Sequence, residues 1–307
     1  LSLSYTSGTT GRLKGVLVSH RTAYLNSLGN KFLWKIDKHP NFLWTLPMFH
    51  SNGWRFPWTV AALAGTNICL RKIDVKKIIF LIKKYKVTNM CCAPIILKRL
   101  SEKEFKLNHT VEVLMAGSSP PANLIKKIQK KGFNVTHMYG LVEASSAAIC
   151  EYQNNWSIQK EKIEILKSRQ GVRNLLLDEL RIVNAKTKKN VKWNSKEIGE
   201  IHLRGNIVAN EYYKNKEETR KSFKNGWFLT GDLAVVHKDG YFEIKDRSKD
   251  IIISGGENIS STEIEKVIDD HPKVLKSAVV GKLDENWGEV PYAFINLKKN
   301  CQMEKRE

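Results

Sequence analysis

Hydroxyl side chains, glycines and one lysine are concentrated in residues 5–15, between two short apolar runs. Glycine lets the backbone turn with positive φ and approach a ligand closely. Successive loop N–H groups can then form a concavity that binds anions. The hydroxyl groups add donors and the lysine adds a positive charge, so the segment indicates a site for a polyphosphate. Its members with this chemistry are Thr6, Ser7, Gly8, Thr9, Thr10, Gly11 and Lys14.

The segment is not a Walker A P-loop, which has the pattern G-x-x-x-x-G-K-[ST]. Counted from Gly8, Leu13 stands where the second glycine belongs, and Gly15 follows the lysine in place of Ser or Thr. The alternative interpretation is a flexible Ser/Thr/Gly-rich turn without a ligand. The choice between the two depends on the rest of the chain.

The elements around this segment alternate between strands and helices. Strands are expected at 1–5, 42–48, 66–71, 87–93, 111–116 and 133–138, and helices at 21–33, at 75–85, from Pro94 and at 122–131. This alternation predicts βαβ units and a parallel sheet. In such sheets ligands bind beyond the carboxyl ends of the strands. We therefore expect the polar, glycine-containing segments 6–15, 117–121 and 139–146 to lie at such ends.

From about residue 175 the pattern changes to short strands separated by turns, with strands expected at 180–183, 199–204, 227–229, 234–237 and 241–244. This part predicts an antiparallel sheet or small barrel. A helix at 261–270 and strands at 274–281 and 293–297 predict a small α+β domain. The fold class is therefore α/β, with a large domain at 1–248, β-rich from about 175, and a truncated small domain at 249–307.

Composition limits the classes of function. With 51 basic and 31 acidic residues the formal net charge is +20, which favours nucleic acid, an acidic membrane surface or phosphate-rich small ligands. The lysines occur as scattered short pairs, typical of a solvated surface, so nucleic acid is not an expected partner. No apolar run reaches the roughly 18–20 residues of a membrane span. The five cysteines include no C-x-x-C pair and are expected to be buried free thiols in a reducing compartment.

Five motifs, in order, resemble those of the adenylate-forming superfamily, whose members include acyl-CoA synthetases. Residues 5–15 resemble its phosphate loop, 47–50 its histidine segment, 139–143 its Tyr-Gly-x-Thr-Glu motif, 227–233 its Thr-Gly-Asp motif, and 246–259 its hinge and glycine loop. The resemblance covers nearly the whole chain. Within the family, 246–261 and 287–289 are most similar to plant acyl-activating enzymes for short, medium or aromatic acids.

The resemblance implies roles for individual residues. The phosphate segment would hold the β- and γ-phosphates of ATP, and Glu143 would hold Mg²⁺, a cation that prefers oxygen ligands. His50 would gate the carboxylate site. Lys249, between the ribose-side arginine and a glycine loop, is predicted to be the hinge between two half-reactions. The remaining residues assigned to the nucleotide are Gly117, Ser118, Ser119, Pro120, Tyr139, Gly140, Asp232 and Arg247.

Among these, Tyr139 would stack near adenine, while Asp232 would accept hydrogen bonds from the ribose hydroxyls and Arg247 would donate to them. Taken singly, each residue has a plainer interpretation. His50 is a structural histidine, Glu143 an acid at a helix start, Asp232 a turn residue and Arg247 a surface charge. The joint pattern is what favours the functional interpretation.

The chain departs from the family pattern at several places. Leu13 replaces the usual proline before Lys14, and Val142 replaces a threonine whose hydroxyl would face the α-phosphate. The family's C-terminal catalytic lysine and the upstream part of the large domain do not occur in this sequence. We therefore expect these 307 residues alone not to make acyl-CoA.

The predicted function is that of an ATP-dependent acid–CoA ligase, with ATP, Mg²⁺, coenzyme A and a small carboxylic acid as cofactors and partners, in the cytoplasm or the peroxisome. The alternatives are a catalytically inactive nucleotide-binding remnant and another adenylate-forming enzyme, of the carrier-protein adenylation or luciferase-like type.

Overall fold

The computed structural model describes residues 1–6, 13–34, 36–149, 163–255 and 257–303. The chain forms two compact units. The first contains Leu1–Arg181, His202–Leu229 and His237–Glu243, and the second contains Ile182–Ile201, Thr230–Val236 and Ile244–Glu307.

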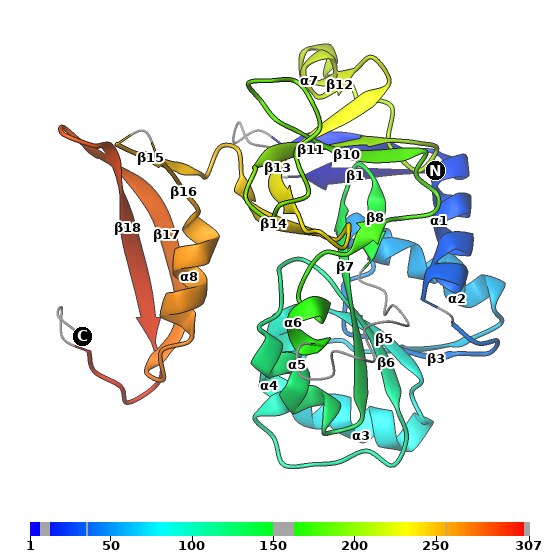
Figure 1. Ribbon diagram of the computed structural model, residues 1–307. Coiled ribbons are helices and arrows are strands. Elements are labelled where there is room, and N and C mark those ends of the chain that lie inside the picture. Colours follow the sequence, from blue (N-terminus) through cyan, green and yellow to red (C-terminus); the bar gives the residue numbers. More distant parts are fainter. Residues whose placement is uncertain (7–12, 35, 150–162, 256, 304–307) are drawn as a thin grey trace. The chain divides into compact units, whose positions relative to one another are not determined.

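A seven-stranded sheet in the order β4-β3-β5-β6-β7-β8-β9 is the centre of the first unit (Figure 1). Pairing is parallel from β4 through β7 and antiparallel between β7 and β8 and between β8 and β9. The predicted parallel sheet and the α/β class are thus confirmed. The strands are β3 (Asn41–Trp44), β4 (Thr66–Cys69), β5 (Asn89–Cys92), β6 (Val111–Met115), β7 (Phe133–Leu141), β8 (Ser145–Ile149) and β9 (Val172–Arg173).

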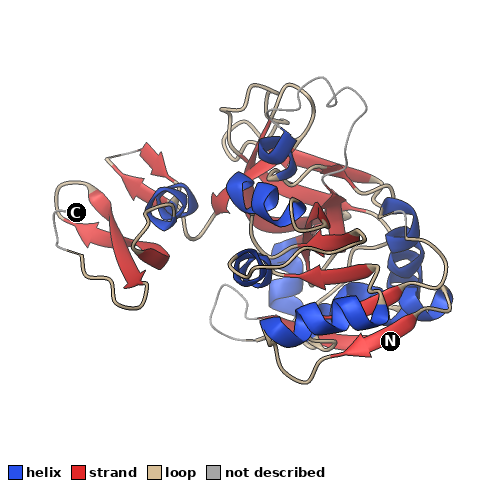
Figure 2. Ribbon diagram, turned by 90° about the horizontal axis from the view of Figure 1, so that it is seen from below, coloured by secondary structure: helices blue, strands red, loops and turns tan. Residues whose placement is uncertain are grey.

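Alternate residues of these strands enter two different apolar clusters, one on each face of the sheet. Met90 packs with residues of α3 (Val75–Tyr85), α4 (Pro94–Ser101) and α5 (Ala122–Gln129). Its neighbour Cys91 packs with Phe56 and Val60 of α2 (Phe56–Ala62). Because successive side chains of a strand point to opposite faces, a strand covered on both faces must be apolar throughout. Figure 2 shows the helices flanking these strands.

Some of the helices begin where the sequence offers a capping side chain. Ser19 accepts a hydrogen bond from the N–H of Thr22 at the start of α1 (His20–Leu33). Asp74 does the same for α3, whose observed bounds are the predicted ones. Satisfying such free N–H groups contributes roughly 1 kcal/mol per cap.

The phosphate segment does not end a strand of the parallel sheet, contrary to expectation. It connects β1 (Ser2–Thr6) to β2 (Lys14–Val18), which form a separate antiparallel two-stranded sheet. Residues 139–146 also differ from expectation, because 139–141 continue β7 and Ser145 already belongs to β8. Only 117–121 follows the carboxyl end of a parallel strand, β6.

The β-rich part is a five-stranded sheet in the order β10-β11-β13-β12, with β14 also paired to β13. The two strands expected at 227–229 and 234–237 are one continuous strand, β13. Lys238–Gly240 form the predicted turn between β13 and β14. The helix of this part of the chain is α7 (Lys216–Ser222), whereas α6 (Ile163–Lys167) precedes it and contacts α5 and β7. The strands are β10 (Glu179–Val183), β11 (Gly199–Arg204), β12 (Phe223–Lys224), β13 (Trp227–Val236) and β14 (Phe242–Arg247).

The last part of the second unit is a four-stranded sheet in the order β16-β15-β18-β17, with α8 (Ser261–Asp269) against β17 (Figure 1). The predicted α+β pattern is confirmed, and the side chain of Ser260 caps α8 by accepting from the Glu263 N–H. Its strands are β15 (Ile252–Ser254), β16 (Glu257–Ile259), β17 (Val274–Asp284) and β18 (Gly288–Leu297).

The four described cysteines are free thiols, but they are not all buried as expected. Cys91 and Cys92 are buried, Cys301 is half-buried and Cys69 is exposed. Burial raises the pKa of the Cys91 thiol, which makes it inert. Cys150 lies outside the described residues. None of the described helices has the length and apolar character needed to span a membrane.

Candidate active site

Lys14 is the lysine of the phosphate segment, and the structure buries it. It begins β2, directly opposite Thr6 in the β1–β2 ladder. Its ammonium group forms an ion pair with the carboxylate of Glu218 on α7. Ser7, Gly8, Thr9, Thr10 and Gly11 lie outside the described residues.

Glu143 lies in the turn between β7 and β8, and not at a helix start. The turn is tight because Gly140 lies against the chain that returns along β8. A Cβ at Gly140 would meet the Ser145 carbonyl oxygen at 1.9 Å. The backbone is fixed further by the Ala209 N–H, which donates to the Glu143 carbonyl oxygen at 2.6 Å. The carboxylate is thus held in place, and its side chain is buried.

Tyr212 connects these two charged groups. Its hydroxyl donates to Oε1 of Glu143 at 2.8 Å, and Lys14 Nζ lies 5.1 Å from the centre of its ring. Burial and the negative charge of Glu143 raise the pKa of the Tyr212 phenol, so it stays protonated and acts as the donor. Lys14, Glu143, Tyr212 and Glu218 together are called the Lys14–Glu143 cluster.

Sequence reasoning missed Tyr212 and Glu218. Neither residue belongs to a motif, and a tyrosine in a connection or a glutamate on a polar helix carries no signal of its own. The local signal is Asn215, whose side chain accepts from the Glu218 N–H and so marks where α7 begins. The side chain of Glu218 is 14% exposed.

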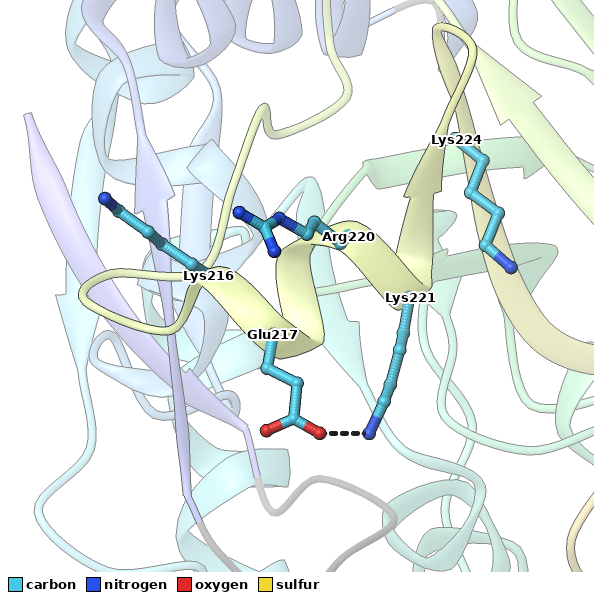
Figure 3. A pocket seen from close by; sticks show the side chains of 5 residues that line it. All are labelled: Lys216, Glu217, Arg220, Lys221 and Lys224. Atoms are coloured by element: carbon cyan, nitrogen blue, oxygen red, sulfur yellow. Dashed lines mark hydrogen bonds and ion pairs between the residues drawn. The ribbon is translucent and has the colours of Figure 1, made fainter.

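Basic residues of α7 and β12 surround a surface pocket. Figure 3 shows Lys216, Arg220, Lys221 and Lys224 there with Glu217, which accepts from Lys221 at 2.7 Å. Ion pairs this exposed contribute little to stability. The two acids differ in exposure: Glu217 is 78% exposed, whereas Glu218 is 14% exposed and contacts both Lys14 and Lys221.

The segment after β6 is open where the sequence places a ligand. Gly117 has φ of +101° and free space around its missing side chain, which suits close approach of a ligand. Ser119 Oγ accepts from the Gln170 amide at 2.6 Å, and Pro120 is buried. Ser118 is exposed.

Tyr139 lies on the adjacent strand, β7. Its side chain is buried, and its ring packs edge-to-face against Phe242, with 5.9 Å between the ring centres.

In the second unit, Asp232 and Arg247 face each other from neighbouring strands. Arg247 Nε lies 3.3 Å from Asp232 Oδ1. Asp232 is inside β13 and not in a turn, with its side chain 12% exposed, whereas that of Arg247 is 61% exposed. The pair presents an acceptor and a fork of donors close together, which is the chemistry that a ribose diol requires.

His50 and Lys249 occupy exposed positions. His50 begins the short 3₁₀-helix η1 (His50–Arg55) and follows the exposed Phe49, so it is not enclosed by aromatic rings. Lys249 is in the turn after β14, where its ammonium group is 3.7 Å from Asp250. A turn with exposed side chains can absorb changes in backbone angles, as a hinge requires.

The described residues contain no group of three or more side chains that could hold a metal by themselves. Glu143 alone offers a buried carboxylate at the Lys14–Glu143 cluster. This fits Mg²⁺ bound together with a nucleotide, because Mg²⁺ usually takes one or two carboxylates and completes its shell with phosphate oxygens and water.

A mostly parallel sheet, with Lys14 and Glu143 positioned by one tyrosine, is typical of nucleotide-binding proteins of the α/β class. The chain belongs to the AMP-binding enzyme family, whose model matches residues 1–213. The model of the AMP-binding enzyme C-terminal domain matches residues 263–307.

The curated relatives include several plant CoA ligases. The chain is 46% identical to a peroxisomal trans-cinnamate:CoA ligase of Petunia hybrida, over 99% of this chain and 55% of the relative. It is 47% identical to a peroxisomal acetate/butyrate–CoA ligase of Arabidopsis thaliana, over 98% of this chain and 54% of the relative. The chain therefore spans about half the length of the curated relatives that it matches.

Solved structures share the fold. The o-succinylbenzoate CoA synthetase of Bacillus subtilis with its acyl-adenylate intermediate matches with a TM-score of 0.86 and 29% identity, over 98% of this chain and 60% of that chain. The same enzyme in complex with ATP and magnesium ion matches with a TM-score of 0.85 and 28% identity, over 98% of this chain and 60% of that chain.

Proposed function

We propose that the protein activates a carboxylic acid with ATP as an acyl-adenylate and then transfers the acyl group to coenzyme A. The observation that carries this proposal is the Lys14–Glu143 cluster, in which one buried tyrosine joins the lysine of the phosphate segment to a buried carboxylate. Membership of the AMP-binding enzyme family and the CoA ligases among the relatives support it.

The reaction explains why these residue types are needed. A carboxylate is a poor electrophile because oxide is a poor leaving group. Attack of the carboxylate on the α-phosphate of ATP gives an acyl-adenylate and pyrophosphate, and the thiol of coenzyme A then displaces AMP. Charge develops on phosphate oxygens in the first step, so fixed donors and positive charge there lower the barrier.

In this proposal Lys14 and the segment from Thr6 hold the phosphates, and Glu143 holds Mg²⁺, which would neutralise phosphate charge. Tyr212 keeps the Glu143 carboxylate in one orientation. Tyr139 and 117–120 line the adenine site, Asp232 and Arg247 hold the ribose, and His50 closes the acid site. Lys249 is the hinge between a large domain at 1–248 and a small domain from 249.

An inactive nucleotide-binding remnant is the second candidate, and the observation that favours it is Val142. Its side chain packs against the apolar cluster of Val16, Ala209 and Tyr212, where the family pattern has a threonine. A missing hydroxyl donor at a phosphate site can cost on the order of 10²–10³ in rate.

The test is ATP–pyrophosphate exchange by the full-length protein with a panel of carboxylic acids, compared with Glu143→Gln. Exchange that depends on the acid and on Glu143 supports the proposal, and its absence with every acid supports the inactive remnant. Mass spectrometry of products formed with coenzyme A or a carrier protein separates an acid–CoA ligase from other adenylate-forming enzymes.

We also propose, from the names of the relatives, that the protein is located in the peroxisome or the cytoplasm. Imaging of the tagged protein in plant cells tests this location.

A further inference from the structure

Arg55 is the largest fully buried side chain of the chain's described part, and the backbone around it is unusual. It ends η1 with φ of +70°, and residues 51–54 before it also have φ between +43° and +53°. Left-handed backbone at non-glycine residues is strained and persists where surrounding contacts enforce it, which is frequent at ligand sites. The segment follows β3, at the carboxyl side of the parallel sheet.

The guanidinium of Arg55 has only neutral partners among the described residues. Nε donates to Ser145 Oγ at 3.1 Å, and Nη1 donates to the Ser51 carbonyl oxygen at 3.2 Å and to Asn52 Oδ1 at 2.9 Å. Nη2 is buried without a hydrogen-bond partner in the part of the chain that is described. No described carboxylate forms an ion pair with this side chain.

Among the described residues, the buried Arg55 cation lacks both an anionic partner and a hydrogen bond at Nη2. Burial lowers the pKa of Arg55 to about 10, which still leaves it protonated at neutral pH. A buried cation is costly unless a nearby anion offsets the lost hydration, and the offset is best when the remaining N–H groups are hydrogen-bonded. Nη2 has two N–H groups for such an anion, and a guanidinium matches the geometry of a carboxylate.

The contacts of Arg55 place it among the segments proposed to activate the acid. Ser145 is two residues after Glu143, on the same hairpin. Asn52 Oδ1 also accepts from Ser2 Oγ at 2.5 Å and Ser4 Oγ at 3.1 Å, and these lie on β1, which leads into the phosphate segment. His50, assigned to the carboxylate site, begins the same short segment, η1, that Arg55 ends.

We propose that Arg55 binds a second anionic group of the acid, so that the protein takes a dicarboxylic acid, with one carboxylate reacting and the other held by Nη2. This rests on the proposed function. The phosphates of ATP are the other anions at hand, but Lys14 and Mg²⁺ would serve them in the proposed function, and Arg55 is five residues after His50, the residue proposed for the acid site. A dicarboxylate would satisfy the orphan N–H groups, whereas a monocarboxylate would leave them unpaired.

The test is calorimetry on the full-length protein with succinate and butyrate, four-carbon acids that differ in the second carboxylate. The expected result is at least tenfold tighter binding of succinate, since one hydrogen bond to a charged group is worth about this factor. Arg55→Met, of similar length and without charge, should lose this preference and keep its affinity for Mg-ATP. Equal binding of both acids by the wild type would overturn the proposal.

Two further results would also overturn it: an unchanged preference in Arg55→Met, and a loss of Mg-ATP affinity without a loss of succinate affinity. The second would mean that the guanidinium serves phosphate. If Arg55→Met does not fold, the wild-type preference and Arg55→Lys, which keeps a charge but not the fork, decide the matter. Binding needs no turnover, so a failure of pyrophosphate exchange refutes the proposed function separately.

Discussion

The hydroxyl of Tyr212 donates a hydrogen bond to Oε1 of Glu143 at 2.8 Å, across 69 positions of sequence. The same tyrosine ring lies beneath the ammonium group of Lys14. The residue proposed to hold phosphate and the residue proposed to hold Mg²⁺ are thus positioned by one side chain that neither motif contains.

Replacing Tyr212 by Phe removes this hydrogen bond and keeps the ring. We expect the affinity of the full-length protein for Mg-ATP to fall about tenfold, because a hydrogen bond to a charged group contributes about 1.5–3 kcal/mol and Glu143 would lose its orientation. Isothermal calorimetry measures the change. Tyr213→Phe is the matched control, since Tyr213 is its exposed neighbour. Equal affinities in the two variants would rule out a positioning role.

The Lys14–Glu218 ion pair predicts a dependence of stability on pH. The hydrogen bond that Glu218 accepts from Lys14 holds the pKa of this carboxyl below the ordinary value of 4.5. A carboxyl with a depressed folded pKa adds stability above its unfolded pKa, and this stability is lost as the pH falls through the folded value. Glu218→Gln should therefore lower the free energy of unfolding at pH 7, by about 1.5–3 kcal/mol, and by progressively less below pH 4.5.

Urea denaturation of the wild type and Glu218→Gln, at pH 7 and below pH 4.5, measures this difference in the free energy of unfolding. The control is Glu217→Gln on the same helix, where the carboxylate is exposed and pairs with Lys221. That change should cost less than about 1 kcal/mol at either pH. A loss for Glu218→Gln that does not shrink on acidification would show that packing, and not charge, is responsible.

Asp232 is predicted to hold the ribose of the nucleotide together with Arg247. Asp232→Ala should weaken AMP binding roughly 10- to 100-fold, since it removes a charged hydrogen-bond acceptor. Calorimetry with AMP tests this directly. Asp250→Ala, at an exposed carboxylate that contacts Lys249, should bind AMP like the wild type. An unchanged affinity in Asp232→Ala would remove this residue from the nucleotide site.

Val142 is predicted to limit the rate of adenylation. Val142→Thr restores a hydroxyl beside Glu143 and should raise the rate of pyrophosphate release, by up to the 10²–10³ range associated with one such donor. Since Val142 packs on Val16 and Tyr212, the hydroxyl also carries a stability cost. Val142→Ala controls for loss of packing and should bring no gain. If Val142→Thr folds and is no faster, another group already makes the contact.

Lys249 is predicted to be the hinge between the two half-reactions. Its turn is closed by the N–H groups of Asp250 and Ile251, which both donate to the Arg247 carbonyl oxygen. Lys249→Pro fixes φ at the turn and should spare either adenylation or thioester formation while blocking the other. Single-turnover assays of each half-reaction measure this, with Lys249→Ala as control. Equal losses in both half-reactions would contradict a hinge at this residue.

Local patterns in the sequence determined most of the secondary structure. The apolar spacing of 75–85 and the side chain of Asp74 define α3 completely, because periodicity and capping depend on neighbours within a few residues. The alternation of such elements was sufficient for the parallel sheet. It failed at 227–237, where a glycine and polar residues suggest a turn but the ladder with β11 and β14 keeps the strand continuous.

In the candidate site, too, the sequence indicated some residues, whereas the contacts between distant residues came only from the tertiary structure. Residue types alone marked the phosphate segment, and the resemblance to family motifs marked Glu143 and the Asp232–Arg247 pair, since each motif is local. Only tertiary structure decided that Lys14 pairs with Glu218, 204 residues away, and that Arg55 is buried against Ser145, 90 residues away. The reason is physical: burying a charge requires a partner, and which side chain can serve is fixed by how distant segments pack, which no local pattern records.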